Sequence, residues 1–169
     1  ALKLAGRTMT AEEQEALTGR LSKPQPVLEL LQRQSGLIVL GDPGAGKTTF
    51  LKYLALKLAR GEGAELNLGE RLPILAPLSG YANALEKQTV RLDDFIAGYF
   101  HDLGTYFPVK AQLADALQRG VALLLLDGLD EVQDCNLRHL VVEQVVNFYN
   151  AHREAGNKFV LTSRIVSNT

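Results

Sequence analysis

The strongest constraint on the fold is a glycine-rich turn between a short apolar run and a helix-forming segment. Residues 41–48 match the phosphate-loop pattern, in which four residues separate a first glycine from Gly-Lys-Thr or Gly-Lys-Ser. Residues 37–40 before the turn are all apolar, as in a buried strand, and residues 49–58 after it carry apolar side chains on one helical face. The pattern therefore predicts a strand, a turn and a helix that together bind phosphate groups.

Each residue type in the turn has a physical reason. Glycine adopts left-handed dihedrals and lets backbone N–H groups approach an anion closely. Lys47 would reach the β- and γ-phosphates of a nucleotide, and the Thr48 hydroxyl would bind Mg²⁺, which prefers oxygen ligands. The following helix directs its positive dipole end at the same phosphates. The residues expected to bind the nucleotide are Gly41, Asp42, Pro43, Gly44, Ala45, Gly46, Lys47, Thr48 and Thr49.

Composition limits the alternatives. A chain of 169 residues with 46% hydrophobic content suits one domain with a sizeable core, and a net charge of -1 gives no basic footprint for nucleic acid or an acidic membrane. The longest apolar run, residues 121–126, is too short to span a bilayer, and residues 1–20 do not resemble a secretory leader. The single cysteine, Cys135, excludes an internal disulfide. These features predict a cytoplasmic protein.

Apolar runs alternate with helix-forming segments along the chain. Strands are expected at residues 37–40, 73–78, 121–126 and 158–162. Helices are expected after the phosphate loop as far as residue 60 and at residues 94–103, 109–119 and 136–154, with a polar loop at residues 61–72. Two prolines in the second strand place it at a sheet edge. This alternation predicts a three-layer α/β/α fold around a parallel sheet.

The first residues are expected to form a helical lead-in, residues 1–26, to a nucleotide-binding domain that covers residues 27–169. Thr10 and Glu13 have the spacing of a capping box, which predicts a helix over residues 11–21. Residues 27–34 resemble a second short helix.

Acidic residues follow the apolar run at residues 121–126. Asp127 comes directly after it, at the carboxyl edge of the predicted sheet, where open α/β sheets hold their ligands. Asp127 can hold Mg²⁺ opposite Thr48, directly or through water. Asp130 and Glu131 follow on the turn, and one of them could orient or deprotonate an attacking water. The alternative is that this acidic pair only compensates the dipole of the next helix.

The last predicted strand also ends in polar residues. Thr162, Ser163 and Arg164 follow the apolar Phe159-Val160-Leu161. The Arg164 guanidinium could reach a γ-phosphate and sense whether it is present. A solvated arginine is the alternative.

Together these motifs resemble the NACHT family of phosphate-loop NTPases, within the STAND class of signalling ATPases. The resemblance covers about residues 27–166 and is carried by residues 41–49, Asp127-Gly128-Leu129-Asp130-Glu131 and Leu161-Thr162-Ser163-Arg164. A small residue after the first Asp, followed by an acidic pair, is its most diagnostic feature. The sequence around the phosphate loop is similar to that of bacterial members. Ile165 departs from the proline that many relatives carry there.

The resemblance implies Mg²⁺-dependent binding and slow hydrolysis of ATP, with GTP as the alternative, as the switch of a larger, self-oligomerising signalling or antiphage defence protein. The guanine-reading Asn-Lys-x-Asp pattern is absent from the sequence, which favours adenine. The family's sheet order is 5-1-4-3-2. The strands expected here give 1-4-3-2, so strand 5 is expected to be missing and the isolated chain to be a weak NTPase. Two other functions stay open: a module that holds nucleotide without turnover, and a small-molecule kinase.

Overall fold

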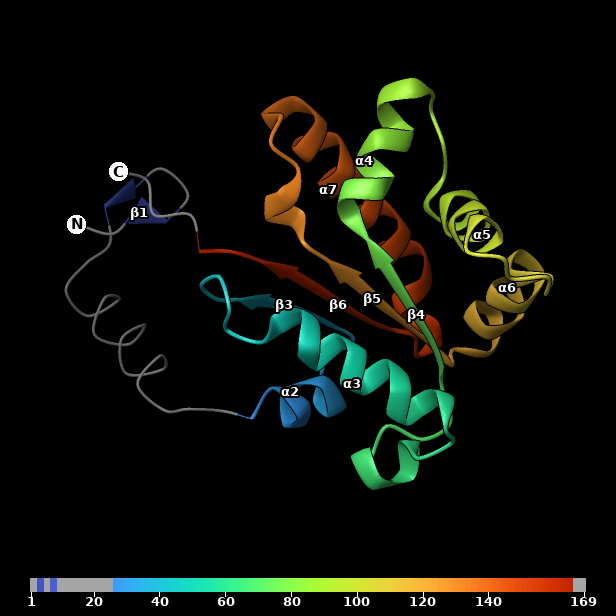
Figure 1. The fold of residues 1–169 in the computed structure, drawn as a ribbon. Helices are drawn as coiled ribbons and strands as arrows, with labels where there is room; N and C mark the ends of the chain where they lie inside the picture. Colours follow the sequence, from blue (N-terminus) through green and yellow to red (C-terminus); the bar gives the residue numbers. More distant parts are fainter. Residues whose placement is uncertain (1–2, 5–6, 9–25, 166–169) are drawn as a thin grey trace.

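A parallel four-stranded sheet forms the centre of the molecule, with strand order β3-β6-β5-β4 (Figure 1). The computed structural model describes residues 3–4, 7–8 and 26–165. The strands of this sheet are β3 (Gly36–Leu40), β4 (Leu72–Pro77), β5 (Ala122–Asp127) and β6 (Lys158–Ser163). The predicted α/β class, the parallel sheet and the order 1-4-3-2 are confirmed.

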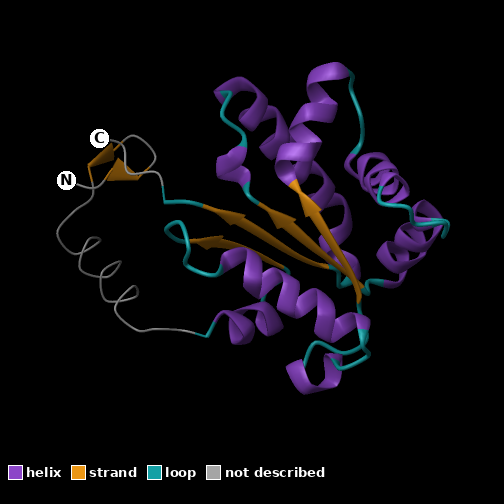
Figure 2. Cartoon of the chain, in the orientation of Figure 1, coloured by secondary structure: helices purple, strands orange, loops and turns teal. Residues whose placement is uncertain are grey.

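Helices cover both faces of this sheet, as Figure 2 shows in the same orientation. One face is covered by α2 (Val27–Arg33) and α3 (Lys47–Ala59). The other carries α4 (Leu78–Lys87), α5 (Leu92–Asp102), α6 (Val109–Arg119) and α7 (Cys135–His152). Short 3-10 turns are η1 (Gly63–Leu66), η2 (Leu129–Glu131) and η3 (Arg153–Ala155). A separate antiparallel pair joins β1 (Lys3–Leu4) to β2 (Arg7–Thr8).

The two layers explain why the central strand is continuously apolar. Leu123 and Leu125 of β5 pack with Leu51 and Leu54 of α3, whereas alternate residues of β5 pack into the cluster beneath α4 to α7. A strand alternates its side chains between two faces, and here both faces are covered. Residues 122–126 are consequently fully buried.

Helix α4 lies outside the elements predicted from the sequence. It begins at Leu78, directly after Pro77, and no side chain caps its N-terminus, so the usual start signal is missing. Its buried residues, Leu78, Tyr81, Ala82 and Leu85, nevertheless follow helical spacing. The predicted strand 73–78 therefore ends one residue earlier, because Leu78 belongs to the helix.

Three smaller predictions can be compared with the structure. The predicted polar loop contains η1 and two buried leucines, Leu66 and Leu68, which pack into the α3 layer. The predicted helix at 136–154 is interrupted, since α7 ends at His152 and η3 follows. β4 lies at a sheet edge, as its prolines indicated. The predicted helix at residues 11–21 lies outside the described residues.

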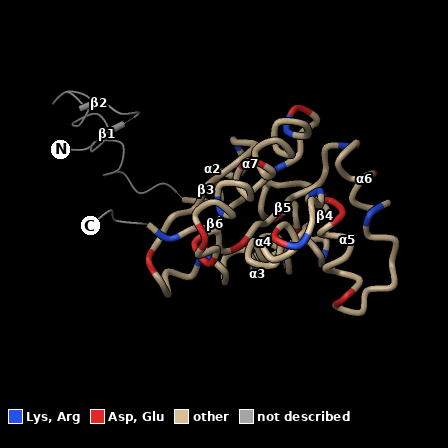
Figure 3. The backbone as a smooth tube through the Cα atoms, turned by 90° about the horizontal axis from the view of Figure 1, so that it is seen from above, with Lys and Arg blue, Asp and Glu red and all other residues tan. Residues whose placement is uncertain are grey.

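The surface carries both signs of charge. Segments of Lys and Arg are interspersed with segments of Asp and Glu along the described chain when the molecule is seen from above (Figure 3). This distribution agrees with a net charge of -1. No helix among the described residues has the length and apolarity that a membrane crossing requires.

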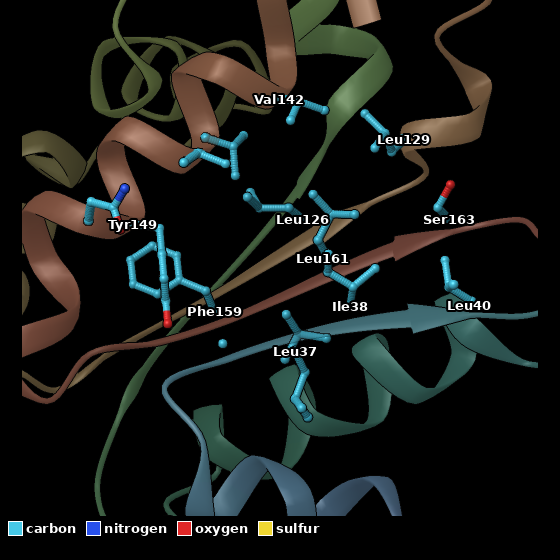
Figure 4. Close-up of a pocket in the computed structure, with 15 residues that line it drawn as sticks. Leu37, Ile38, Leu40, Leu126, Leu129, Val142, Tyr149, Phe159, Leu161 and Ser163 are labelled. Atoms are coloured by element: carbon cyan, nitrogen blue, oxygen red, sulfur yellow. The ribbon is translucent and has the colours of Figure 1, made fainter. Parts of the chain in front are cut away.

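The sheet face beside β3 is hollow and apolar. Side chains from β3, β6 and α7 line a cavity of about 530 Å³, among them Leu37, Leu161 and Tyr149 (Figure 4). β3 ends the sheet, and within the described part of the chain it pairs only with β6. Ile38 and Leu40 on this strand are 70% and 57% exposed. None of residues 41–49, Asp127, Asp130, Glu131 or Arg164 lines this hollow.

Candidate nucleotide-phosphate site

The phosphate loop connects β3 to α3 at the carboxyl edge of the sheet. Gly44 and Gly46 have φ angles of 79° and 80°, a left-handed region that other residues rarely adopt. Gly46 immediately precedes α3, so the unpaired N–H groups of the first helical turn face the mouth of the loop. These two glycines therefore meet a backbone requirement of an anion-binding turn.

A polar hollow of about 270 Å³ brings the predicted residues together. Gly41 and Asp42 lie just outside it, and all the other predicted site residues line it. The lining residues are Pro43, Gly44, Ala45, Gly46, Lys47, Thr48, Thr49, Asp127, Gly128, Asp130, Glu131, Thr162 and Arg164.

Lys47 is folded over its own loop. Its Nζ donates hydrogen bonds to the carbonyl oxygens of Gly41 at 2.6 Å and Asp42 at 3.0 Å. The backbone N–H of Gly41 donates to the Ser163 carbonyl at 3.3 Å, which ties the start of the loop to the end of β6. The ammonium group is thus held within the loop, where a phosphate oxygen can replace the carbonyl contacts.

Two hydroxyl groups fix the Asp127 carboxylate. Thr48 Oγ1 donates to Asp127 Oδ2 at 2.8 Å, and Thr162 Oγ1 donates to Oδ1 at 2.5 Å. The backbone N–H of Gly128 in turn donates to Thr162 Oγ1 at 2.9 Å. Because the Thr48 hydroxyl donates its hydrogen bond to Asp127, the lone pairs of its oxygen can bind a metal ion.

Thr162 lines the candidate site, and sequence reasoning assigned it no role. It is fully buried, although its hydroxyl is polar, and that hydroxyl connects β6 to the end of β5. The register that pairs Leu126 with Leu161 sets Asp127 beside Thr162. The available signal was a hydroxyl residue at the end of an otherwise apolar strand.

Both the backbone and the surroundings of Gly128 favour a residue without a side chain. Its φ is 78°, and a Cβ built there would lie 3.0 Å from Glu131 Cδ, so the Glu131 carboxyl group packs over this glycine. Glu131 itself is exposed. The tight η2 turn thus places its carboxyl group over Gly128, the residue that follows Asp127.

Arg164 is paired with Asp130. Its Nε lies 2.7 Å from Asp130 Oδ2, and its backbone N–H donates to Oδ1 at 3.0 Å. The Asp130 side chain is 12% exposed and the Arg164 side chain 54%. The structure therefore brings these two predicted residues together on one wall of the pocket.

The site by itself offers few metal ligands. Within residues 26–165 no group of three or more His, Cys, Asp or Glu side chains has a metal-binding arrangement. Thr48 and Asp127 supply one hydroxyl and one carboxylate, a donor set that suits Mg²⁺ when phosphate oxygens and water complete its coordination. The residues present therefore fit a metal that arrives with a nucleotide.

The parallel sheet, the phosphate loop at its carboxyl edge and the Thr48–Asp127 hydrogen bond define a phosphate-loop NTPase fold and site. The model of the NACHT domain matches residues 35–164, and the chain belongs to this family. Membership implies a nucleotide-binding NTPase that uses a divalent metal. No curated protein and no solved structure gave a match.

Proposed function

We propose that this chain binds ATP with Mg²⁺ and hydrolyses it slowly, as the nucleotide switch of a STAND-type signalling or defence protein. The observation that carries the proposal is the hydrogen bond between Thr48 and Asp127, which joins the phosphate loop to the end of β5. Thr48 and Asp127 would hold a metal ion at this junction, where it would offset phosphate charge, and the α3 N-terminus faces the same anion.

Each polar group has a distinct part in this proposal. Residues 41–49 surround the phosphates with backbone N–H groups, and Lys47 contributes the positive charge. Thr48 and Asp127 hold Mg²⁺, which neutralises phosphate charge. Asp130 or Glu131 orients the attacking water, and Arg164 reaches the γ-phosphate.

The proposed role, location and nucleotide preference rest on family membership and on the sequences of the motifs. The sequence around the phosphate loop supports a bacterial-type member with a role in antiphage defence, acting in the cytoplasm and oligomerising as part of a larger protein. ATP is preferred over GTP because the sequence lacks a guanine-reading motif. The domain is proposed to cover residues 27–169, after a lead-in at residues 1–26.

A second candidate is a module that holds nucleotide without turnover. The engagement of Asp130 by Arg164 favours it, because this contact occupies one of the two carboxylates that could activate water. Turnover measured on the full-length protein separates the two candidates, since only a switch releases phosphate.

Replacement of Lys47 by alanine tests the binding site. Lys47→Ala removes a charge-assisted contact worth roughly 1.5–3 kcal/mol, so the affinity for Mg²⁺-ATP should fall about ten- to a hundredfold. Lys52→Ala is the matched control, because Lys52 is an exposed lysine of the same helix that does not line the pocket. Affinity is measured by calorimetry, with circular dichroism to verify folding. Equal affinity for both folded variants would refute the assignment.

A further inference from the structure

One carboxylate holds Arg164 at two points. Asp130 Oδ1 accepts the backbone N–H of Arg164, and Oδ2 forms an ion pair with its side-chain Nε at 2.7 Å. The backbone contact fixes where the chain leaves β6, and the side-chain contact fixes the guanidinium direction. Both partners line the phosphate pocket. Asp130 is therefore placed to determine where Arg164 presents its charge.

The same contacts oppose a role for Asp130 as the base. A proton taken from water would neutralise the negative charge that holds the guanidinium, so proton transfer and Arg164 binding compete on one group. Glu131 is exposed, lies over Gly128 beside Asp127, and within the described chain its carboxylate forms no ion pair. The two acidic neighbours thus have different surroundings.

The guanidinium keeps part of its donor capacity. Asp130 forms its ion pair at Nε, whereas within residues 26–165 the two terminal NH₂ groups form no hydrogen bond. A guanidinium has five N–H donors in a rigid fork, so one edge can be held while the other binds a phosphate oxygen. Such fixation lowers the conformational cost of binding the third phosphate.

We propose that Asp130 is a positioning residue that holds Arg164 for the terminal phosphate of a nucleoside triphosphate, and that Glu131 alone orients the attacking water. This inference rests on the proposed nucleotide site. Asp130 then contributes to discrimination between triphosphate and diphosphate, and Glu131 contributes to turnover.

A double-mutant cycle on the chain tests the inference. The measured quantity is the ratio of the ADP dissociation constant to the ATP dissociation constant, with Mg²⁺, for wild type, Asp130→Asn, Arg164→Ala and the double variant. Loss of one charge-assisted contact should lower this ratio roughly tenfold in each single variant. The double variant should show no further decrease, because Asp130 acts through Arg164. Asp115→Asn is the control, since Asp115 forms an exposed pair with Arg119 away from the pocket.

Two further variants make the test decisive. Glu131→Gln should keep the wild-type ratio and suppress hydrolysis in the full-length protein. Arg164→Lys should lower the ratio of the dissociation constants as much as Arg164→Ala does, because one ammonium group cannot bind Asp130 and a phosphate together. This variant also tests the inference if Asp130→Asn fails to fold.

Several results would overturn the inference. An unchanged ratio in Asp130→Asn or Arg164→Lys, or additive losses in the double variant, would show that Asp130 does not act through Arg164. Loss of hydrolysis in Asp130→Asn with an unchanged ratio would make Asp130 the base. These outcomes leave the proposed function intact, whereas a wild-type chain that binds neither nucleotide would refute both.

Discussion

Individual side chains of the site fix one another through short polar contacts. Asp127 receives hydroxyl protons on both oxygens, and the second donor, Thr162, is itself oriented by the Gly128 N–H. A carboxylate restrained in this way loses little rotational freedom when Mg²⁺ binds. The geometry of the proposed metal site therefore depends on a residue that lies behind it.

Thr162→Val tests this dependence because valine keeps the shape and removes the hydroxyl. The change leaves the Gly128 N–H without its acceptor and Asp127 Oδ1 without its donor. This loss should cost about 1–3 kcal/mol of stability and weaken Mg²⁺-dependent nucleotide binding. Thr162→Ser is the matched control and should retain both properties. The measurements are urea unfolding and ATP affinity with and without Mg²⁺. Equal Mg²⁺ dependence in the valine variant would show that Thr162 only fills space.

The acidic residues that follow β5 should have separable effects. Asp127→Asn should weaken Mg²⁺-dependent binding of ATP, because it removes charge beside the metal. Glu131→Gln should leave binding nearly unchanged and slow hydrolysis, since a water-orienting group acts mainly in the transition state. Binding and phosphate release are compared for both variants in the full-length protein. Wild-type turnover by Glu131→Gln would assign the base elsewhere.

Among the elements, α7 links the site to the core. It begins after the acidic η2 turn and buries Val141, Val145 and Phe148 against the sheet. Its start is set by Asp134, whose Oδ1 accepts the backbone N–H of Leu137 at 2.8 Å. This cap satisfies one of the N–H groups that a helix start leaves without an internal partner.

Loss of this cap should destabilise the domain. Asp134→Ala is expected to lower the free energy of unfolding by about 1 kcal/mol. Gln133→Ala is the control, because Gln133 is the exposed neighbour and caps no helix. Chemical denaturation followed by circular dichroism measures both. A midpoint for Asp134→Ala equal to that of the control would mean that water replaces the cap without loss.

At the scale of the whole molecule, the two edges of the sheet differ. β4 carries prolines that weaken its capacity to pair with another strand. β3 instead exposes Ile38 and Leu40 beside the apolar cavity that α7 leaves open. Among the described strands β3 has one neighbour, so its other side offers backbone groups and apolar surface to another chain.

We therefore expect the 169-residue chain to self-associate as its concentration rises. Replacement of both Ile38 and Leu40 by lysine should reduce association, because charge on an edge strand opposes pairing. Tyr106→Ser is the control, since Tyr106 is 98% exposed but does not line the cavity. Light scattering over a concentration series measures the effect. A wild-type chain that stays monomeric throughout would contradict the prediction.

Sequence patterns were sufficient wherever the cause is local. The phosphate loop, the four strands and the strand-end position of Asp127 were predictable because turn chemistry and apolar periodicity act within a few residues, whereas the strand order was expected from the family resemblance. Helix α4 escaped this reasoning, since it starts after Pro77 without a side-chain cap.

Only the tertiary structure decided which polar groups meet. Thr162 lies 35 positions from Asp127 and Arg164 lies 34 from Asp130, and both pairs form because β5 and β6 are adjacent and in register. The sequence by itself thus determined the loop, the sheet and the candidate acidic residues. The assembled sheet decided that Thr162 fixes Asp127 and that Asp130 pairs with Arg164, because hydrogen bonds between distant segments depend on strand order and register.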